Sequence, residues 1–206
     1  MTRRPGFVVY GLLAAFVLGS AAPFYWSFLL GSHTAAVAAQ GTPPLLPGGH
    51  FLDNAQRVMD TVPFWKALGN SILVSTVAAT SVTFFATLAG YAFAKLRFRG
   101  NAGLMAFVVA TMAVPTQLGV VPLFIVMAKL GWAGSIWAVI VPSLVTAFGV
   151  FFMRQYLVDA VPDELIEAAR MDGCSMFRTF LTVAVPAARP AAAMLWLFTF
   201  MYTWTD

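Results

Sequence analysis

The chain has 206 residues, of which 60% are apolar and only 10% are charged. Because soluble domains carry about 25% charged residues, this composition excludes an ordinary soluble globule and indicates a protein of the lipid bilayer. The formal net charge of +4 at pH 7 does not indicate a nucleic-acid partner, since the basic residues lie in short gaps between apolar blocks and not in a patch with interleaved aromatic residues.

Residues 7–30 form the first apolar block. About 20 apolar residues span a bilayer core of roughly 30 Å, so a membrane helix is predicted here. A signal peptide is the alternative, because Thr2-Arg3-Arg4 and Ser20-Ala21-Ala22 are typical of a basic leader and a cleavage site. The apolar run continues well past that site, and we therefore expect an uncleaved helix.

Residues 31–65 contain clusters of glycine and proline, which are loop signals. One short surface helix is predicted inside this loop, from Leu52 to Asp60. His33 and His50 lie here in polar sequence rich in glycine and proline, where solvated histidines are expected and no metal site is. The single cysteine, Cys174, excludes an internal disulfide and any metal site built from several cysteines.

Residues 68–96 form the second apolar block. Small residues let membrane helices approach closely, and hydroxyl groups can bond to neighbouring backbones. A stripe of such residues, spaced by four on one helix face, predicts a packing surface, and the alternative is that part of it lines a polar path. The stripe consists of Ser71, Ser75, Ala79, Thr83 and Thr87.

Residues 103–129 form the third block, which is interrupted by two prolines. Pro115 and Pro122 are seven residues apart, so both are expected to kink one helix on nearly the same side. Gln117 at membrane depth is costly unless it has a partner. This helix is therefore predicted to face the interior of the bundle.

Two further blocks flank a polar segment, residues 154–189. Residues 135–153 form a fourth predicted membrane helix, with a break at Pro142-Ser143, and residues 190–206 form a fifth. The fifth block has barely reached spanning length where the sequence stops, so C-terminal truncation is expected. The predicted fold is an all-α polytopic membrane protein, a single transmembrane domain over residues 1–206 with about five membrane helices.

The distribution of basic residues predicts the topology, because cytoplasmic ends and loops are enriched in lysine and arginine. The N-terminus and the segment 154–189 are then cytoplasmic, and the loop 31–65 is outside. The richer, cytoplasmic set holds Arg3, Arg4, Lys95, Arg97, Arg99, Arg154, Arg170, Arg178 and Arg189; the other set holds Arg57, Lys66 and Lys129.

Within the polar segment, a helix of about three turns is predicted over residues 162–172. Pro162 suits its first turn, and Gly173 suits the left-handed position after its end. Glu167 and Arg170, three residues apart, are expected to form a pair. One flank of this helix, on which two alanines leave little bulk, consists of Leu165, Ala168, Ala169 and Asp172. Such a flank suits docking in a groove of another protein, although a helix that only connects two membrane helices is the simpler interpretation.

A second, more apolar helical piece is predicted after Gly173, along the membrane surface. It contains Phe177, Phe180 and Leu181. Val185-Pro186 is then expected to turn the chain back into the bilayer.

The polar segment resembles the EAA signature of ABC importer permeases, which reads EAA, three residues, G, nine residues, I-x-L-P. Here Glu167-Ala168-Ala169 is followed by Gly173 and by Val183-Ala184-Val185-Pro186 at those spacings, with valine at the isoleucine and leucine positions. More of the chain is similar to the carbohydrate branch of these permeases, and within it to the maltose-G type: Gly90 to Gly100, Val114-Pro115-Thr116-Gln117, and Tyr202 to Asp206, where Thr205 replaces the usual asparagine.

The resemblance implies the MetI-like helical bundle of the binding-protein-dependent inner-membrane components, with a sixth helix that would follow Asp206. The protein would be one of two permease subunits in the inner membrane, forming a heterodimer with a second permease above two ATPase subunits that bind ATP and Mg. An extracytoplasmic sugar-binding protein would deliver the solute. The chain itself would hold no cofactor and no catalytic residue.

The resemblance also implies roles for particular residues. The coupling segment that contacts the ATPase would use Glu167, Ala168, Ala169, Arg170, Asp172, Gly173 and Pro186. As a separate hypothesis, Thr116, Gln117 and Trp204 face the sugar path.

Other functions fit the residues less well. The lysines Lys66, Lys95 and Lys129 follow Trp65, Ala94 and Ala128, so the sequence contains no phosphate-binding loop for ATP hydrolysis. A secondary, ion-coupled transporter is the main alternative, but the first four membrane blocks contain no aspartate or glutamate to bind a coupling ion. An intramembrane enzyme also fits poorly, because both histidines lie in the outer loop and no G-x-S-x-G is present.

Overall fold

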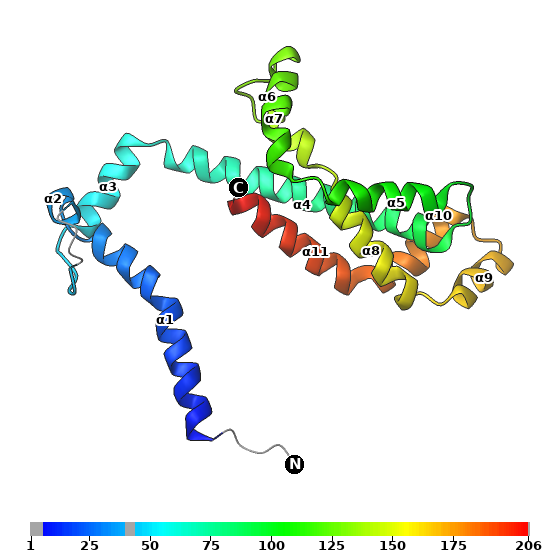
Figure 1. Ribbon diagram of the computed structural model, residues 1–206, viewed down its shortest axis with the longest axis horizontal. Helices are drawn as coiled ribbons and strands as arrows, with labels where there is room; N and C mark the ends of the chain where they lie inside the picture. The colour runs from blue at the N-terminus through cyan, green and yellow to red at the C-terminus, as the bar shows by residue number, and fades with distance from the viewer. Residues whose placement is uncertain (1–5, 40–43, 206) are drawn as a thin grey trace. The chain divides into compact units, whose positions relative to one another are not determined.

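The computed structural model describes residues 6–39 and 44–205, and every regular element in these ranges is a helix (Figure 1). The chain divides into two compact units, Met1–Ala67 and Leu68–Asp206.

The first unit is built around α1 (Phe7–Gly31), which is exposed over almost its whole length. After it, α2 (Ala35–Ala38) and α3 (Phe51–Thr61) lie in the predicted loop, and α3 confirms the short helix expected there. Polar bonds tie this loop to the end of α1. The Ser32 hydroxyl accepts a hydrogen bond from the backbone amide of Gly48 at 2.8 Å. The side-chain amide of Asn54 donates to the carbonyls of Gly31 and His33 at 3.0 and 2.8 Å.

The second unit begins inside α4 (Phe64–Lys95) and continues through a series of helices. In chain order these are α5 (Asn101–Met112), the 3₁₀ turn Thr116–Gly119, α6 (Val120–Lys129), α7 (Trp137–Ile140), the 3₁₀ turn Val141–Ser143, α8 (Ala147–Ala160), α9 (Asp163–Met171), α10 (Met176–Thr179), the π turn Phe180–Ala184 and α11 (Val185–Thr205).

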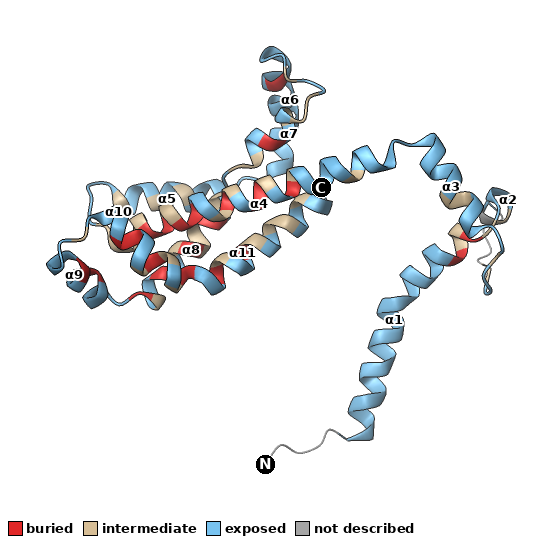
Figure 2. Ribbon diagram, turned by 180° about the vertical axis from the view of Figure 1, so that it is seen from behind, coloured by how far each residue is buried: buried red, intermediate tan, exposed pale blue. Residues whose placement is uncertain are grey.

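The core of the second unit lies where α4, α8 and α11 run side by side (Figures 1 and 2). Two glycines allow this close approach. A Cβ atom on Gly90 of α4 would lie 2.8 Å from both the backbone nitrogen of Arg154 and the Cβ of Met153 on α8. A Cβ on Gly149 of α8 would lie 3.1 Å from the Cβ of Ala86 on α4.

The small-residue stripe of α4 forms part of this core. Ser75, Ala79 and Thr87 are buried and Thr83 is half-buried, whereas Ser71 is exposed. The predicted packing face is therefore confirmed from Ser75 onward.

Within the described ranges, four helices are long and apolar enough to cross a membrane: Phe7–Gly31, Phe64–Lys95, Trp137–Ala160 and Met176–Thr205. A bent pair, Asn101–Met112 with Thr116–Lys129, makes a fifth if it is one span. The prediction of about five membrane helices agrees with this range.

The third predicted helix, residues 103–129, is wrong as a single kinked helix. The structure bends by 87° between Asn101–Met112 and Thr116–Lys129. Pro115 is extended, with φ −60° and ψ 124°, and a proline disfavours the helical conformation in the residue before it. Pro122 causes no second kink, because it lies in the first turn of α6, where a missing N–H is harmless.

The turn expected at Val185-Pro186 is also absent. The helix is continuous from Met176 to Thr205, and Pro186 is the second residue of α11, so this membrane helix begins well before residue 190. The π turn Phe180–Ala184 directly precedes it. A wider π turn leaves room for the proline ring, which would otherwise clash with the carbonyl four residues earlier. The fourth membrane helix, predicted over residues 135–153, is also longer than expected, because α8 ends only at Ala160.

Candidate functional site

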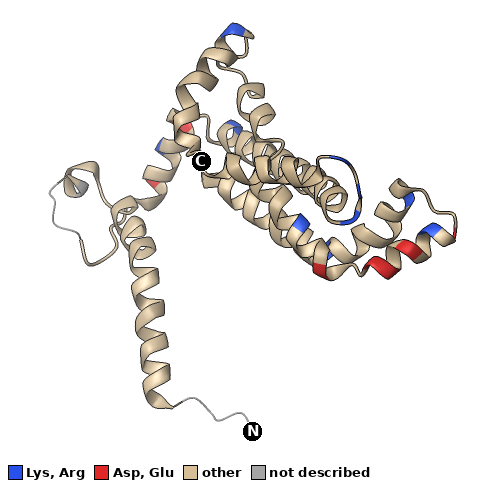
Figure 3. Ribbon diagram, turned by 45° about the vertical axis from the view of Figure 1, so that its right-hand side comes forward, with Lys and Arg blue, Asp and Glu red and all other residues tan. Residues whose placement is uncertain are grey.

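The polar segment forms a charged end of the second unit, with α9 at its tip (Figure 3). Pro162 is extended, with φ −57° and ψ 142°, so α9 starts one residue later than predicted, at Asp163. Asp163 and Glu164 occupy the first turn and Arg170 the last, which is the arrangement that the helix dipole favours.

Gly173 ends α9 as predicted. Its φ of +75° is in the left-handed region, where a residue with a Cβ is strained. The amide of Cys174 donates to the Ala169 carbonyl at 2.9 Å, and the amide of Gly173 donates to the Arg170 carbonyl at 3.0 Å. These bonds satisfy carbonyls that the helix end would otherwise leave free.

We expect Gly173→Ala to destabilise this end of α9 by about 1–2 kcal/mol, because a Cβ is strained at positive φ. Hydrogen exchange at the Cys174 amide should become faster. Gly173→Asn should be milder than Gly173→Ala, because asparagine tolerates the left-handed region. No atom lies within 4 Å of the position that a Cβ would take at Gly173, so steric crowding is not the expected cause of the destabilisation. A larger loss of stability in Gly173→Asn than in Gly173→Ala would contradict the explanation by backbone strain.

The two faces of α9 differ sharply in exposure. Ile166 and Ala169 are buried, at 4% and 9% exposure, because residues three apart lie on one face. Ala169 therefore packs against its own chain and is not part of an open low-bulk flank, which corrects the prediction. The outer face consists of Glu164, Leu165, Glu167, Ala168, Met171 and Asp172, all exposed.

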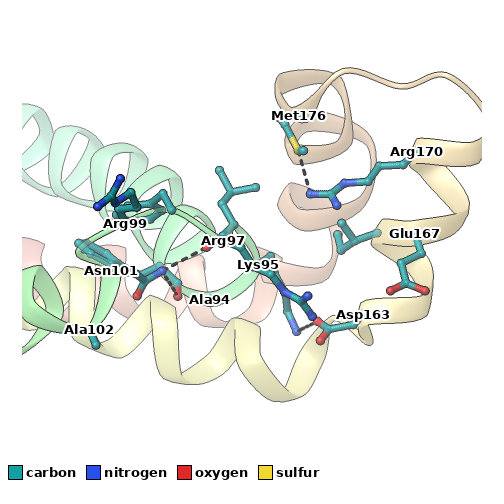
Figure 4. Close-up of a pocket in the computed structure, with 14 residues that line it drawn as sticks. Ala94, Lys95, Arg97, Arg99, Asn101, Ala102, Asp163, Glu167, Arg170 and Met176 are labelled. Atoms are coloured by element: carbon teal, nitrogen blue, oxygen red, sulfur yellow. Dashed lines mark hydrogen bonds and ion pairs between the residues drawn. The ribbon is translucent and has the colours of Figure 1, made fainter.

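The predicted pair between Glu167 and Arg170 does not form in this described region. The guanidinium of Arg170 instead lies 3.4 Å from the sulfur of Met176, and the carboxylate of Glu167 is directed away from it (Figure 4). The Glu167 side chain is exposed.

A contact that sequence reasoning missed joins α9 to the end of α4. The ammonium of Lys95 lies 2.8 Å from Oδ1 of Asp163 (Figure 4). The hydrogen bond from Lys95, together with the positive charges of Lys95 and Arg97, holds the pKa of the Asp163 carboxyl below its ordinary value. No local signal could reveal this pair, because the two residues are 68 positions apart.

A groove of about 1070 Å³ lies between α9 and the loop that connects α4 to α5. One side of the groove is basic and the other carries both signs of charge, so a partner with mixed charge suits it. Its charged lining residues are Lys95, Arg97, Arg99, Asp163, Glu167 and Arg170.

The segment after Gly173 is also anchored to α4. Ser175 caps α10 by accepting the Arg178 amide at 3.2 Å. The hydroxyl of Tyr91 reaches the Met176 carbonyl at 3.5 Å, and its ring lies 5.5 Å from that of Phe180. Pro186 lies beyond this anchor, inside the membrane helix.

The residues proposed for the sugar path are spread over two elements. Thr116 and Gln117 lie in the exposed 3₁₀ turn before α6. Trp204 lies near the end of α11, where its ring stacks on Phe200 at 5.8 Å. Thr116 and Gln117 thus lie on a different element from Trp204, and the role of the three residues in a sugar path stays a prediction.

Comparison with known proteins gives the family. Residues 83–206 match the family described as "Binding-protein-dependent transport system inner membrane component". The chain belongs to this family. Its expected all-α permease fold is thereby confirmed.

Individual relatives agree with this assignment. The arabinooligosaccharides transport system permease protein AraQ of Halalkalibacterium halodurans is 32% identical over 69% of this chain and 51% of its own length. The lactose transport system permease protein LacG of Rhizobium radiobacter is 27% identical over 99% of this chain and 74% of its own length. The chain thus spans about half of AraQ and about three quarters of LacG.

A solved structure shares the fold. It is the crystal structure of a bacterial ABC transporter involved in the import of the acidic polysaccharide alginate. The match has a TM-score of 0.81 at 28% identity and covers 98% of this chain and 71% of that chain.

Proposed function

We propose that this protein is a membrane subunit of an ATP-driven importer of a carbohydrate or a related solute. Family membership supports an inner-membrane component that works with a binding protein. The names of AraQ and LacG concern arabino-oligosaccharides and lactose, and that of the solved transporter concerns alginate, so saccharides are the solute class to test first.

The coupling to ATP is assigned to α9. Its buried face, Ile166 and Ala169, holds it to the bundle, and its outer face presents both acidic and apolar side chains. Met171 is 87% exposed and Leu165 is 51% exposed, which is costly for apolar side chains in water and suits a surface that another protein covers. A partner ATPase seated on this face would hold the ATP and Mg.

The remaining subunits follow from this assignment. A second permease would complete the pathway as a heterodimer, two ATPase subunits would lie below, and a binding protein would deliver the solute from outside. The N-terminus and α9 would be cytoplasmic, as the distribution of basic residues predicts.

Reconstitution tests the proposal. The full-length protein with its second permease, ATPase subunits and binding protein is placed in liposomes, and ATP hydrolysis is measured with arabino-oligosaccharides, lactose and alginate oligosaccharides. We expect one saccharide with the binding protein to stimulate hydrolysis and to accumulate inside. Solute accumulation driven by an ion gradient without ATP would contradict the proposal and favour a secondary transporter.

A further inference from the structure

Lys95, the last residue of α4, joins the ends of three helices in the second unit. Its ammonium donates to Oδ1 of Asp163 at 2.8 Å and to the carbonyl of Val158 at 3.2 Å. Val158 is in the last turn of α8, and Asp163 is the first residue of α9. One side chain therefore bridges the two-residue link between α8 and α9.

The lysine end of this bridge is withdrawn from water. The side chain of Lys95 is only 5% exposed, whereas that of Asp163 is 72% exposed. Pairs in which both partners are exposed contribute little, but an ammonium with so little access to water needs its bonds to protein oxygens. Val161, in the link that Lys95 bridges, is fully buried. The bridge is thus part of the packed end of the bundle.

The Asp163 end of the bridge stays ionised near neutral pH. Lys95 holds the pKa of the Asp163 carboxyl below its ordinary value. A lowered carboxyl pKa means that the pair is intact above the ordinary carboxyl value and is lost only as the pH falls through the lower, folded-state value. Near neutral pH, protonation of Asp163 therefore does not break the bridge.

On the N-terminal side of Lys95, α4 is part of the packed core of the bundle. Five residues earlier, Gly90 is in close contact with Met153 and Arg154 of α8. The Lys95 side chain is 5% exposed and bonds to Val158 and Asp163 at once, so a shift of α9 that preserves the bridge is expected to move the end of α4. Without the bridge, α9 would still be connected through its covalent link and through Ile166, but not polar-bonded to α4.

We propose that Lys95 is a positioning residue that transmits the displacement of α9 to the membrane helix α4. The inference rests on the proposed function of α9 as the helix that contacts the ATPase. ATP-driven movement of α9 pulls on Asp163, the bridge moves the end of α4, and α4 repacks against α8 in the membrane core. Loss of the bridge uncouples hydrolysis from solute movement and leaves ATPase docking intact.

The test measures ATP hydrolysis and solute uptake in the same liposomes, with the complete importer. For Lys95→Met we expect the ATP hydrolysed per solute imported to rise about tenfold, a typical size for a broken coupling contact. The ATPase should still co-purify with the complex. Lys95→Arg should restore most of the coupling, because it retains the charge and a donor for Asp163.

A double-mutant cycle shows whether the two residues act through one bond. Asp163→Asn alone should uncouple to a similar extent, and the double variant should be no worse than either single variant. Asp163 is largely exposed, so this variant remains informative if Lys95→Met fails to fold. If the uncoupling in the double variant equals the product of the effects of the two single substitutions, the residues act independently, and the inference is overturned.

Two substitutions serve as matched controls. Lys129→Met removes a lysine from the last turn of another apolar helix, α6, and Asp159→Asn removes an exposed carboxylate close to Asp163 in sequence. Both should leave the ratio of hydrolysis to uptake unchanged.

The outcomes separate this inference from the proposed function. An unchanged ratio in Lys95→Met, or loss of the ATPase from the complex, would overturn the role of Lys95 while the wild-type importer still works. A wild-type complex without solute-stimulated hydrolysis would instead overturn the proposed function itself.

Discussion

Replacement of Gly90 by alanine should destabilise the helical bundle by about 1–3 kcal/mol, the usual cost of overpacking a tight core. A Cβ at this position would lie 2.8 Å from the Arg154 nitrogen and 2.9 Å from the Met153 carbonyl carbon. Backbone atoms cannot rotate out of the way, so α4 and α8 must separate. Gly90→Leu should leave little folded protein.

The same substitution elsewhere in α4 provides the control. A Cβ on Gly69 meets no atom within 4 Å, and the residue is exposed. Because glycine within a helix costs about 1 kcal/mol relative to alanine, Gly69→Ala should be neutral or stabilising. Thermal unfolding of the purified protein in detergent measures both variants, and a fall in Tm of equal size for the two would contradict the close-contact explanation.

Ala168→Glu should strongly weaken ATPase binding without unfolding the protein, whereas Ala169→Glu should unfold α9. Ala168 is on the exposed face, so a charged side chain there obstructs the partner; we expect co-purification of the ATPase to fall about tenfold or more. Ala169 is 9% exposed, and an unpaired charge in its place should cost about 3 kcal/mol.

The two effects are distinguished by measuring unfolding and ATPase co-purification for each variant. Ala133→Glu adds the same charge in the exposed turn between α6 and α7 and should change neither quantity. Normal ATPase binding by Ala168→Glu would show that the outer face of α9 is not the docking surface.

Features set by a few neighbouring residues could be predicted from the sequence. The end of α9 at Gly173 follows from local backbone geometry, and the stripe from Ser75 to Thr87 follows from helix periodicity. The break at Pro115 was predictable for the same reason. Its 87° angle was not, because the direction of the chain after a proline depends on what the following helix packs against.

Features that depend on distant parts of the chain could not be predicted. The alanines of α9 look equivalent in sequence, but only Ala169 faces the bundle. Pro186 predicts a turn only if the residues before it are α-helical, and the π turn Phe180–Ala184 instead lets the helix continue. The Lys95–Asp163 bridge spans 68 positions, so neither periodicity nor capping rules could reveal it.

That bridge also decides how often the chain crosses the bilayer. Lys95 and Asp163 touch, so they lie on the same side of the membrane, and a chain that returns to the side it left must cross an even number of times between them. Trp137–Ala160 is long and apolar enough to supply one crossing in this interval. If it crosses once, the bent pair from Asn101 to Lys129 must supply the other, because a re-entrant loop would leave the count odd. We therefore expect the sharply bent pair to be a full membrane span.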